Sequence, residues 1–268
     1  MFPPERIVCL TEETVETLYL IGEERRIVGV TGYAVRPPRV RREKPRVSAF
    51  ISADFEKIIA LKPDLVLTFS DLQADIAAEL IRRNIAVHAF NQRDVDGIFA
   101  MIRTLGALVG ATEKAEALAV ALEDRLDEMR EGSSQLPRRP RVYFEEWDEP
   151  MISGLKWVSE LITVAGGIEV FPTLARNKNA ADRIVTAAAV IDAAPDIIIG
   201  SWCGKKFVPA KVKARAGFAA IPAVRDDELH EIKSALILQP GPAALTDGLD
   251  HLVRIIAGWA NHASQAVS

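Results

Sequence analysis

Short runs of apolar residues alternate along the chain with longer stretches in which apolar side chains recur every three or four positions. Apolar runs bounded by turn residues are typical of strands buried on both faces of a parallel sheet, whereas the longer spacing predicts helices. The predicted strands cover residues 6–10, 26–30, 64–69, 85–89, 141–144 and 196–200. The predicted helices cover residues 13–21, 54–61, 72–83, 95–109, 155–165 and 242–259. This alternation predicts an α/β fold.

The longest helical pattern lies over residues 112–131. Thr112 can cap its start, Leu118 and Leu122 share one face, and Gly132 stops it. A helix of this length spans roughly 30 Å, which is the diameter of a small domain. It is either a packed helix of one large domain or the connection between two lobes.

Two similar segments on either side of this helix favour two lobes. Residues 58–67 read IIALKPDLVL and residues 190–199 read VIDAAPDIII, so each combines a helix end, a Pro-Asp turn and an apolar strand. Chance similarity between two ordinary βα units is the alternative. We predict a first lobe over residues 1–110, a connecting helix over 111–135 and a second lobe over 136–268.

Composition and charge narrow the class of protein. The chain has 268 residues, of which 49% are hydrophobic, enough for one large or two average domains. A net charge of −4 gives no reason to expect nucleic acid or an anionic membrane as a partner. Cys9 and Cys203 need not pair, which leaves the redox compartment open.

The start of the chain bears on its location. Met1 is followed directly by a strand-like run, without the basic region and apolar stretch of a secretory signal. There is also no apolar run of about 18 residues that could span a bilayer. We expect either a cytoplasmic protein or a trimmed mature form, and Met1 favours the former.

Motifs for catalysis and metal binding are missing from the sequence. No Gly-x-Ser-x-Gly elbow, phosphate-binding loop or dinucleotide fingerprint occurs. The acidic run 145–149 could hold a general acid and base, or it is a solvated turn. None of the histidines has a partner at the spacing of a zinc helix: His88, His230, His251 and His262. We predict no metal site, no catalytic cofactor and no catalysis.

A basic tract follows the second predicted strand. Residues 36–46 carry six cationic side chains and one acid, Glu43. The tract is either a solvated loop or a field for an anionic ligand, because guanidinium groups suit carboxylate and phosphate. Its candidate anion contacts are Arg36, Arg39 and Arg42. A second basic segment covers residues 205–215.

Aromatic residues stand where strands end. In parallel sheets, ligands bind beyond the carboxyl ends of strands, and aromatic rings there supply flat apolar walls for a planar or cyclic ligand. Each ring alone can equally be a packing residue, but together they favour a binding cleft between the lobes. The candidate ligand contacts are Tyr33, Phe50, Phe69, Trp147 and Trp202.

Several segments resemble the substrate-binding proteins of ABC importers for cobalamin, haem and ferric siderophores. In the first half these are residues 6–16, residues 28–38 with Pro37-Pro38, and residues 55–66. In the second half, Ser153-Gly154, residues 165–167 and residues 195–199 are similar to the same family. The resemblance covers nearly the whole chain. It implies the class III periplasmic-binding-protein fold, in which one long helix joins two Rossmann-like α/β lobes and permits only a modest closure.

Within that family the cobalamin binders look closest. The resemblance places Tyr33, Phe50 and Phe69 against a corrin ring and makes Trp147 and Trp202 the opposing wall. Binding by stacking alone is favoured over cobalt ligation by Cys203. Family members also dock on a permease through an acidic residue on each lobe. The candidates on the first lobe are Asp71, Asp75 and Glu79, whereas the segment after Trp202 is basic.

These observations together predict a monomeric solute-binding protein that takes a corrinoid without catalysis and has an ABC permease as a possible partner. The resemblance implies a periplasmic location, although the chain shows no signal. The first alternative is a ferric siderophore or haem in the same fold, with the basic tract pairing ligand carboxylates. The second is a cytoplasmic corrinoid-handling protein or enzyme that no longer docks on a transporter.

Overall fold

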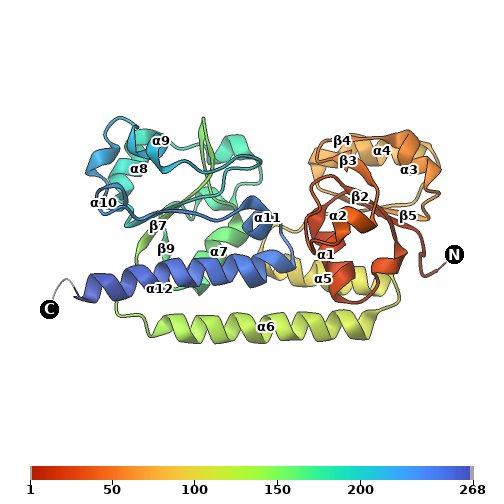
Figure 1. The fold of residues 1–268 in the computed structure, drawn as a ribbon, viewed down its shortest axis with the longest axis horizontal. Helices are drawn as coiled ribbons and strands as arrows, with labels where there is room; N and C mark the ends of the chain where they lie inside the picture. The colour runs from red at the N-terminus through yellow and green to blue at the C-terminus, as the bar shows by residue number, and fades with distance from the viewer. Residues whose placement is uncertain (1, 266–268) are drawn as a thin grey trace. The chain divides into compact units, whose positions relative to one another are not determined.

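The computed structural model describes residues 2–265, which form two compact units (Figure 1). Unit 1 contains the residues up to Gln92 together with Asp96–Leu122, and unit 2 contains Arg93–Val95 and the chain from Glu123 onward. The division falls inside the long helix α6 (Thr112–Ser134). The two halves of this helix therefore belong to different units. Met1, the expected chain start, lies outside the described residues.

Unit 1 is built on a six-stranded sheet of order β4-β3-β2-β1-β5-β6. Its strands are β1 (Ile7–Cys9), β2 (Ile27–Thr31), β3 (Arg46–Ala49), β4 (Ser52–Ala53), β5 (Leu65–Phe69) and β6 (Val87–Phe90). All neighbours are parallel except β4, which pairs antiparallel with β3. The carboxyl ends of five strands therefore share one edge of the sheet, called edge 1 below.

Most helices of unit 1 lie between these strands in the chain, and the last one follows β6. They are α1 (Glu12–Leu20), α2 (Val40–Glu43), α3 (Phe55–Ala60), α4 (Ala74–Arg82) and α5 (Val95–Leu108), with 3-10 turns at Glu24–Arg26 and Asp71–Gln73. Ile58 of α3 and Leu80 of α4 are fully buried in one cluster with Val8 and Val66 of the sheet. Helices α3 and α4 thus cover one face, and the removal of this apolar surface from water stabilises the unit.

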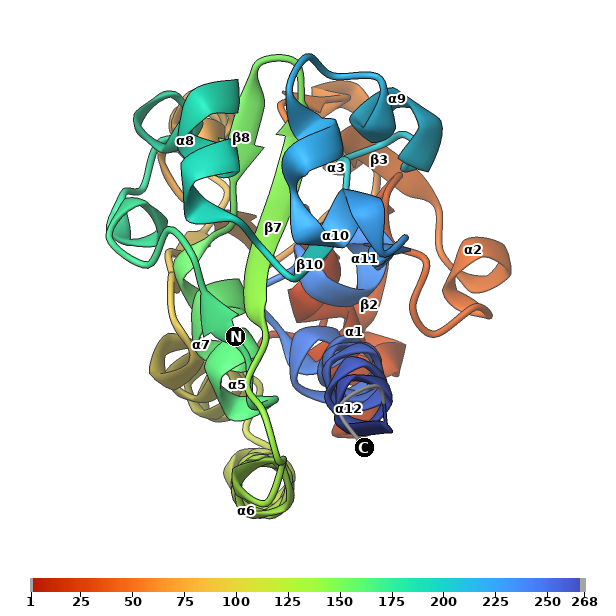
Figure 2. The same ribbon diagram turned by 90° about the vertical axis from the view of Figure 1, so that its left-hand side faces the viewer.

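Unit 2 has a five-stranded sheet in which the order β11-β10-β7-β8 is extended by β9, a second partner of β7. The strands are β7 (Arg141–Asp148), β8 (Met151–Ser153), β9 (Ile168–Glu169), β10 (Ile197–Gly200) and β11 (Leu229–Glu231). β7 runs parallel to β10 and β9 and antiparallel to β8. Figure 2 shows β7 and β8 as a long hairpin. The carboxyl ends of β7, β10 and β11 form the corresponding edge 2.

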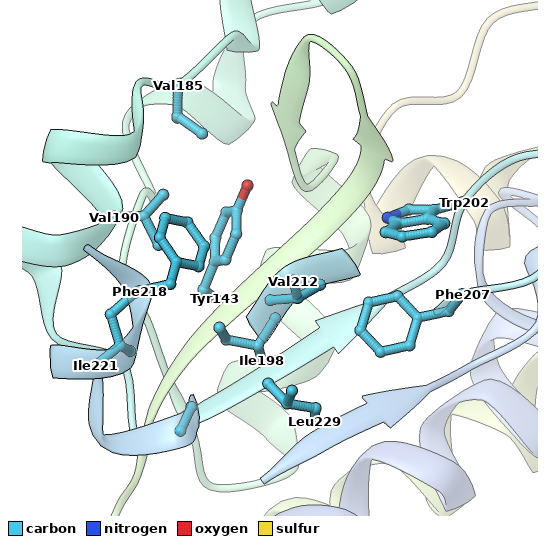
Figure 3. Packing of buried hydrophobic residues seen from close by; sticks show 11 residues of the cluster. Tyr143, Val185, Val190, Ile198, Trp202, Phe207, Val212, Phe218, Ile221 and Leu229 are labelled. Atoms are coloured by element: carbon cyan, nitrogen blue, oxygen red, sulfur yellow. The ribbon is translucent and has the colours of Figure 1, made fainter. Parts of the chain in front are cut away.

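The helices of unit 2 are α7 (Lys156–Val164), α8 (Ala187–Ala193), α9 (Pro209–Lys213), α10 (Pro222–Arg225), α11 (Ser234–Ile237) and α12 (Leu249–Gln265). Shorter turns cover Leu174–Arg176, Ala180–Arg183 and Phe218–Ala220, and a π-helical turn at Ala244–Gly248 precedes α12. Figure 3 shows a buried cluster in which Tyr143 and Ile198 of the sheet pack with Trp202, Phe207 and Phe218. This cluster is the core on one face of the sheet.

The α/β architecture predicted from the sequence is confirmed, and the predicted strands and helices are present. Two segments predicted as loops are instead ordered elements. The acidic run 145–148 is the second half of β7, because β8 pairs with it, and the basic tract contains α2 and β3. Within residues 2–265, none of the helices combines the length and the apolar composition needed to cross a membrane.

Candidate ligand-binding surfaces

Edge 1 carries a group of exposed apolar side chains. Tyr33, which follows β2, is 51% exposed, and Ile51, in the turn between β3 and β4, is 73% exposed. Leu72, which follows β5, is 56% exposed, and Phe50 beside Ile51 is partly exposed. These four side chains are called the edge patch below. Exposed apolar side chains at one edge of a sheet mark a candidate interaction surface.

Gln73 holds the backbone beneath the edge patch. Its side chain is fully buried, and its amide nitrogen donates to the carbonyls of Leu10 at 3.2 Å and Phe50 at 2.8 Å. Its amide oxygen accepts from the Phe69 N–H at 3.0 Å. One side chain therefore ties together the ends of β1, β3 and β5, and this fixes the turn that presents Phe50.

The end of β5 differs from the sequence-based expectation. Phe69, a predicted ligand contact, is only 5% exposed, so its ring is buried and does not offer an open face. The next residue, Ser70, has φ 55° and ψ −177°, a strained conformation for a residue with a side chain. Its N–H donates to the Phe90 carbonyl at 2.7 Å, and its hydroxyl accepts from the Leu72 N–H at 3.3 Å. These bonds hold the strained turn and thereby position Leu72.

Two acids at the start of α1 also lie beside edge 1. Glu13 is 2% exposed, and one of its carboxylate oxygens, Oε1, has no hydrogen-bond partner. Burial raises the pKa of Glu13 to about 7 and, with the charge of Glu13 adding to it, raises the pKa of Glu12 to about 8. The sequence analysis missed both residues. The sequence feature that could have identified them is their position directly after a strand that is predicted to be buried.

Two arginines of the basic tract are paired with acids of unit 1. Arg36 pairs with Glu16 at 2.8 Å, and Arg39 pairs with Glu24 at 3.2 Å and lies over the ring of Tyr19. These arginines therefore hold the tract against neighbouring elements. Among the three predicted anion contacts, the third, Arg42, is exposed.

Edge 2 is organised around a buried carboxylate, Glu145, which is 0% exposed. Two nitrogens of Arg215 donate to its two oxygens at 2.6 and 2.9 Å. The Trp202 indole N–H donates to Oε1 at 2.9 Å, and the Tyr143 hydroxyl donates to Oε2 at 3.0 Å. Burial alone would lower the pKa of Arg215, but the bonds to Glu145 outweigh it and raise the pKa. The sequence analysis left this acid either in a general acid and base pair or in a solvated turn, and neither interpretation included its burial against Arg215.

Trp202 was expected to supply one open wall of a binding cleft. It is 2% exposed, and its ring lies edge to face with Phe207 at a centroid distance of 4.9 Å (Figure 3). The space for Phe207 requires a glycine at position 200, since a Cβ there would come within 1.9 Å of the Phe207 ring. Trp202 is therefore a core residue that anchors its loop to Glu145, which corrects the expectation of an open ring face.

Trp147, the other predicted wall, lies near the end of β7 and is partly exposed. Its indole N–H donates to the Glu149 carbonyl at 2.9 Å, which fixes the ring. The Lys205 ammonium lies 3.9 Å from the ring centroid and also pairs with Asp148. Cys203, which lies in the same loop as Lys205, is exposed.

The predicted docking acids fall into two groups. Glu79 accepts from Arg83 at 2.7 Å and from Arg82 at 3.4 Å, and the Arg83 hydrogen bond is the main cause that lowers its pKa. Asp71 and Asp75 are exposed. Among residues 2–265 there is no group of three or more His, Cys, Asp or Glu side chains placed to hold a metal ion.

Comparisons with known proteins agree with this architecture. A family model described as "Periplasmic binding protein" matches residues 7–236. An uncharacterised ABC transporter substrate-binding lipoprotein of Bacillus subtilis, YvrC, is 27% identical over 94% of this chain and 80% of its own. A vitamin B12-binding protein of Vibrio cholerae is 25% identical over 91% of this chain and 86% of its own. The periplasmic haem-binding protein RhuT from Roseiflexus is 22% identical and superposes with a TM-score of 0.81, covering 94% of this chain and 99% of that one.

Proposed function

Because the chain belongs to the periplasmic binding protein family, whose members serve ABC importers for vitamin B12, haem and siderophores, we propose that it captures a corrinoid and catalyses no reaction. The observation that carries this proposal is the edge patch. Its side chains lie where parallel sheets present ligand contacts, and no acid–base pair or nucleophile stands among them. Such a surface binds by stacking and apolar burial.

The charge beside the edge patch favours a corrinoid over an anionic ligand. Arg36 and Arg39 are already paired with acids, so they do not offer free cations. Burial raises the pKa of Glu12 to about 8 and that of Glu13 to about 7, so both acids carry less negative charge near pH 7 than ordinary carboxyl groups do. A corrinoid presents apolar faces and uncharged amide edges, which match this surface. The vitamin B12-binding protein of Vibrio cholerae supports the same assignment.

The alternative ligand is haem or a ferric siderophore, and one observation favours it. Arg42 is exposed, as are its neighbours Arg41 and Arg46. These guanidinium groups would form ion pairs with the carboxylates of such a ligand. The structural similarity to RhuT is compatible with this alternative.

We further propose that the protein acts as a monomer in the periplasm and presents its ligand to an ABC permease. Asp71, Asp75 and Glu79 are the acids of unit 1 proposed for docking, and the first two are exposed. The similarity to an ABC transporter substrate-binding lipoprotein supports this partner.

Replacement of both Tyr33 and Phe50 by Ala should weaken cyanocobalamin binding roughly tenfold or more. Each lost stacking contact is worth about 1 kcal/mol, and a loss of 1.4 kcal/mol is about tenfold in affinity. Isothermal titration of the purified variant measures the change. Phe2→Ala is the matched control, because Phe2 is an aromatic residue that is 75% exposed but precedes β1 at the opposite end of the strand. Equal affinities for the two variants would contradict ligand contact at the edge patch.

A further inference from the structure

The face of the Trp147 ring is already covered by a side chain of the same unit. The Lys205 ammonium lies 3.9 Å from the ring centroid and 5.3 Å from that of Trp202. Cations within about 6 Å of a ring centroid are attracted by the negative face of the ring. Trp147 therefore does not present a bare indole to a ligand.

The Lys205 ammonium can be displaced from the Trp147 ring more easily than the ring itself can move. Its side chain is 36% exposed, so the ammonium is partly solvated and its hold on the ring is modest. The Trp147 ring is fixed independently by its bond to the Glu149 carbonyl. Trp202 is fixed by Glu145.

Asp148 allows the ammonium to move without losing its counter-ion. The Asp148 side chain is only 9% exposed and pairs with Lys205 and, at 3.9 Å, with Lys211. Burial works against ionisation of this acid, but the hydrogen bond and charge of Lys205 outweigh it and lower the pKa of Asp148. An ammonium that swings off the indole can remain beside the ionised carboxylate.

From these contacts we propose that Lys205 is a specificity-determining residue, which occupies the Trp147 face and must be displaced by any ligand group that stacks there. This inference rests on the proposed corrinoid binding and on the sequence-based prediction that Trp147 contacts the ligand. The competition selects for flat apolar groups of large area, since these replace the cation–π contact with a larger apolar contact. Small polar solutes gain too little on the ring to displace the ammonium.

The test compares three substitutions. Lys205→Ala clears the ring, Lys205→Arg keeps a cation that stacks at least as well, and Lys206→Ala removes an adjacent exposed charge that has no contact with Trp147 among the described interactions. Isothermal titration with cyanocobalamin should show about two- to fivefold tighter binding for Lys205→Ala. Lys206→Ala should match the unchanged protein, and Lys205→Arg should bind equally or more weakly.

A second readout needs no ligand. Neutral acrylamide quenches the fluorescence of accessible tryptophans, and a parallel measurement with Trp147→Phe identifies the part that comes from Trp147. Quenching of Trp147 should increase in Lys205→Ala and stay unchanged in Lys206→Ala. Unchanged quenching, or increased quenching with equal or weaker cyanocobalamin binding, would overturn the proposal. Quenching can also increase while neither the unaltered protein nor Lys205→Ala binds cyanocobalamin, haemin or a ferric siderophore. That result would contradict the proposed function itself and, with it, the role of Lys205 in specificity.

Discussion

Replacement of Glu145 by Ala should lower the free energy of unfolding of unit 2 by about 3–5 kcal/mol. The substitution leaves the guanidinium of Arg215, which is 17% exposed, without its counter-ion. It also removes the acceptor of the Trp202 and Tyr143 hydrogen bonds. A buried charge without a partner costs far more than the pair contributes, so the loss arises mainly from Arg215.

Urea denaturation followed by tryptophan fluorescence measures this loss for unit 2 alone. All four tryptophans, at positions 147, 157, 202 and 259, lie in that unit. With a slope of about 1–3 kcal/mol per molar urea, the midpoint should fall by at least about 1 M. Glu149→Ala removes an exposed acid at the end of the same hairpin and should leave the midpoint nearly unchanged.

A double variant separates the buried charge from the lost packing. Glu145→Met with Arg215→Met replaces both charges with apolar side chains, which is often neutral for a buried pair. This variant should be clearly more stable than Glu145→Ala. If Glu145→Ala has the same midpoint as Glu149→Ala, the buried ion pair does not stabilise unit 2.

Unit 2 should become less stable as the pH rises from about 5.5 to 7.5, owing to one buried acid. Burial raises the pKa of Glu169 to about 8 from an ordinary value of 4.5. The folded unit keeps this proton over a range in which the unfolded chain releases it. The contribution of Glu169 to stability is therefore fully present below about pH 4.5 and is lost as the pH rises to about 8, by at most about 1.4 kcal/mol per pH unit.

Glu169→Gln should flatten this dependence, because an amide does not titrate. Urea midpoints from tryptophan fluorescence at pH 5.5, 6.5 and 7.5 compare the two proteins. His251 works in the opposite direction, since burial lowers its pKa and its contribution to stability grows as the pH rises. That contribution is common to both proteins and cancels in the comparison. Identical pH slopes would show that Glu169 does not carry a proton in the folded unit.

The order of strands and helices could be predicted because it depends on local periodicity. Alternating apolar runs and Pro-Asp turns mark β5 and β10 without reference to the rest of the chain. Tyr33 could also be placed correctly beyond β2, since a loop with adjacent prolines follows that strand. These features could be predicted because they depend only on residues that are close in sequence.

The environment of the site residues could not be predicted in the same way. Glu145 reads as one of four acids in a turn, and its burial depends on Arg215, which lies 70 positions away. Trp147 and Trp202 both follow predicted strands, yet Trp202 is 2% exposed and lies edge to face with Phe207, whereas Trp147 is partly exposed. Such differences arise from contacts distant in sequence, which hydrophobic periodicity does not encode.

The ligand is the central question, and calorimetry of the unaltered protein answers it most directly. Cyanocobalamin, haemin and two ferric siderophores, one catecholate and one hydroxamate, are titrated in parallel into the purified protein. We expect cyanocobalamin to bind with a stoichiometry of one and more tightly than the other three. Binding of haemin or a ferric siderophore without binding of cyanocobalamin would contradict the corrinoid assignment and point instead to the exposed arginines around Arg42.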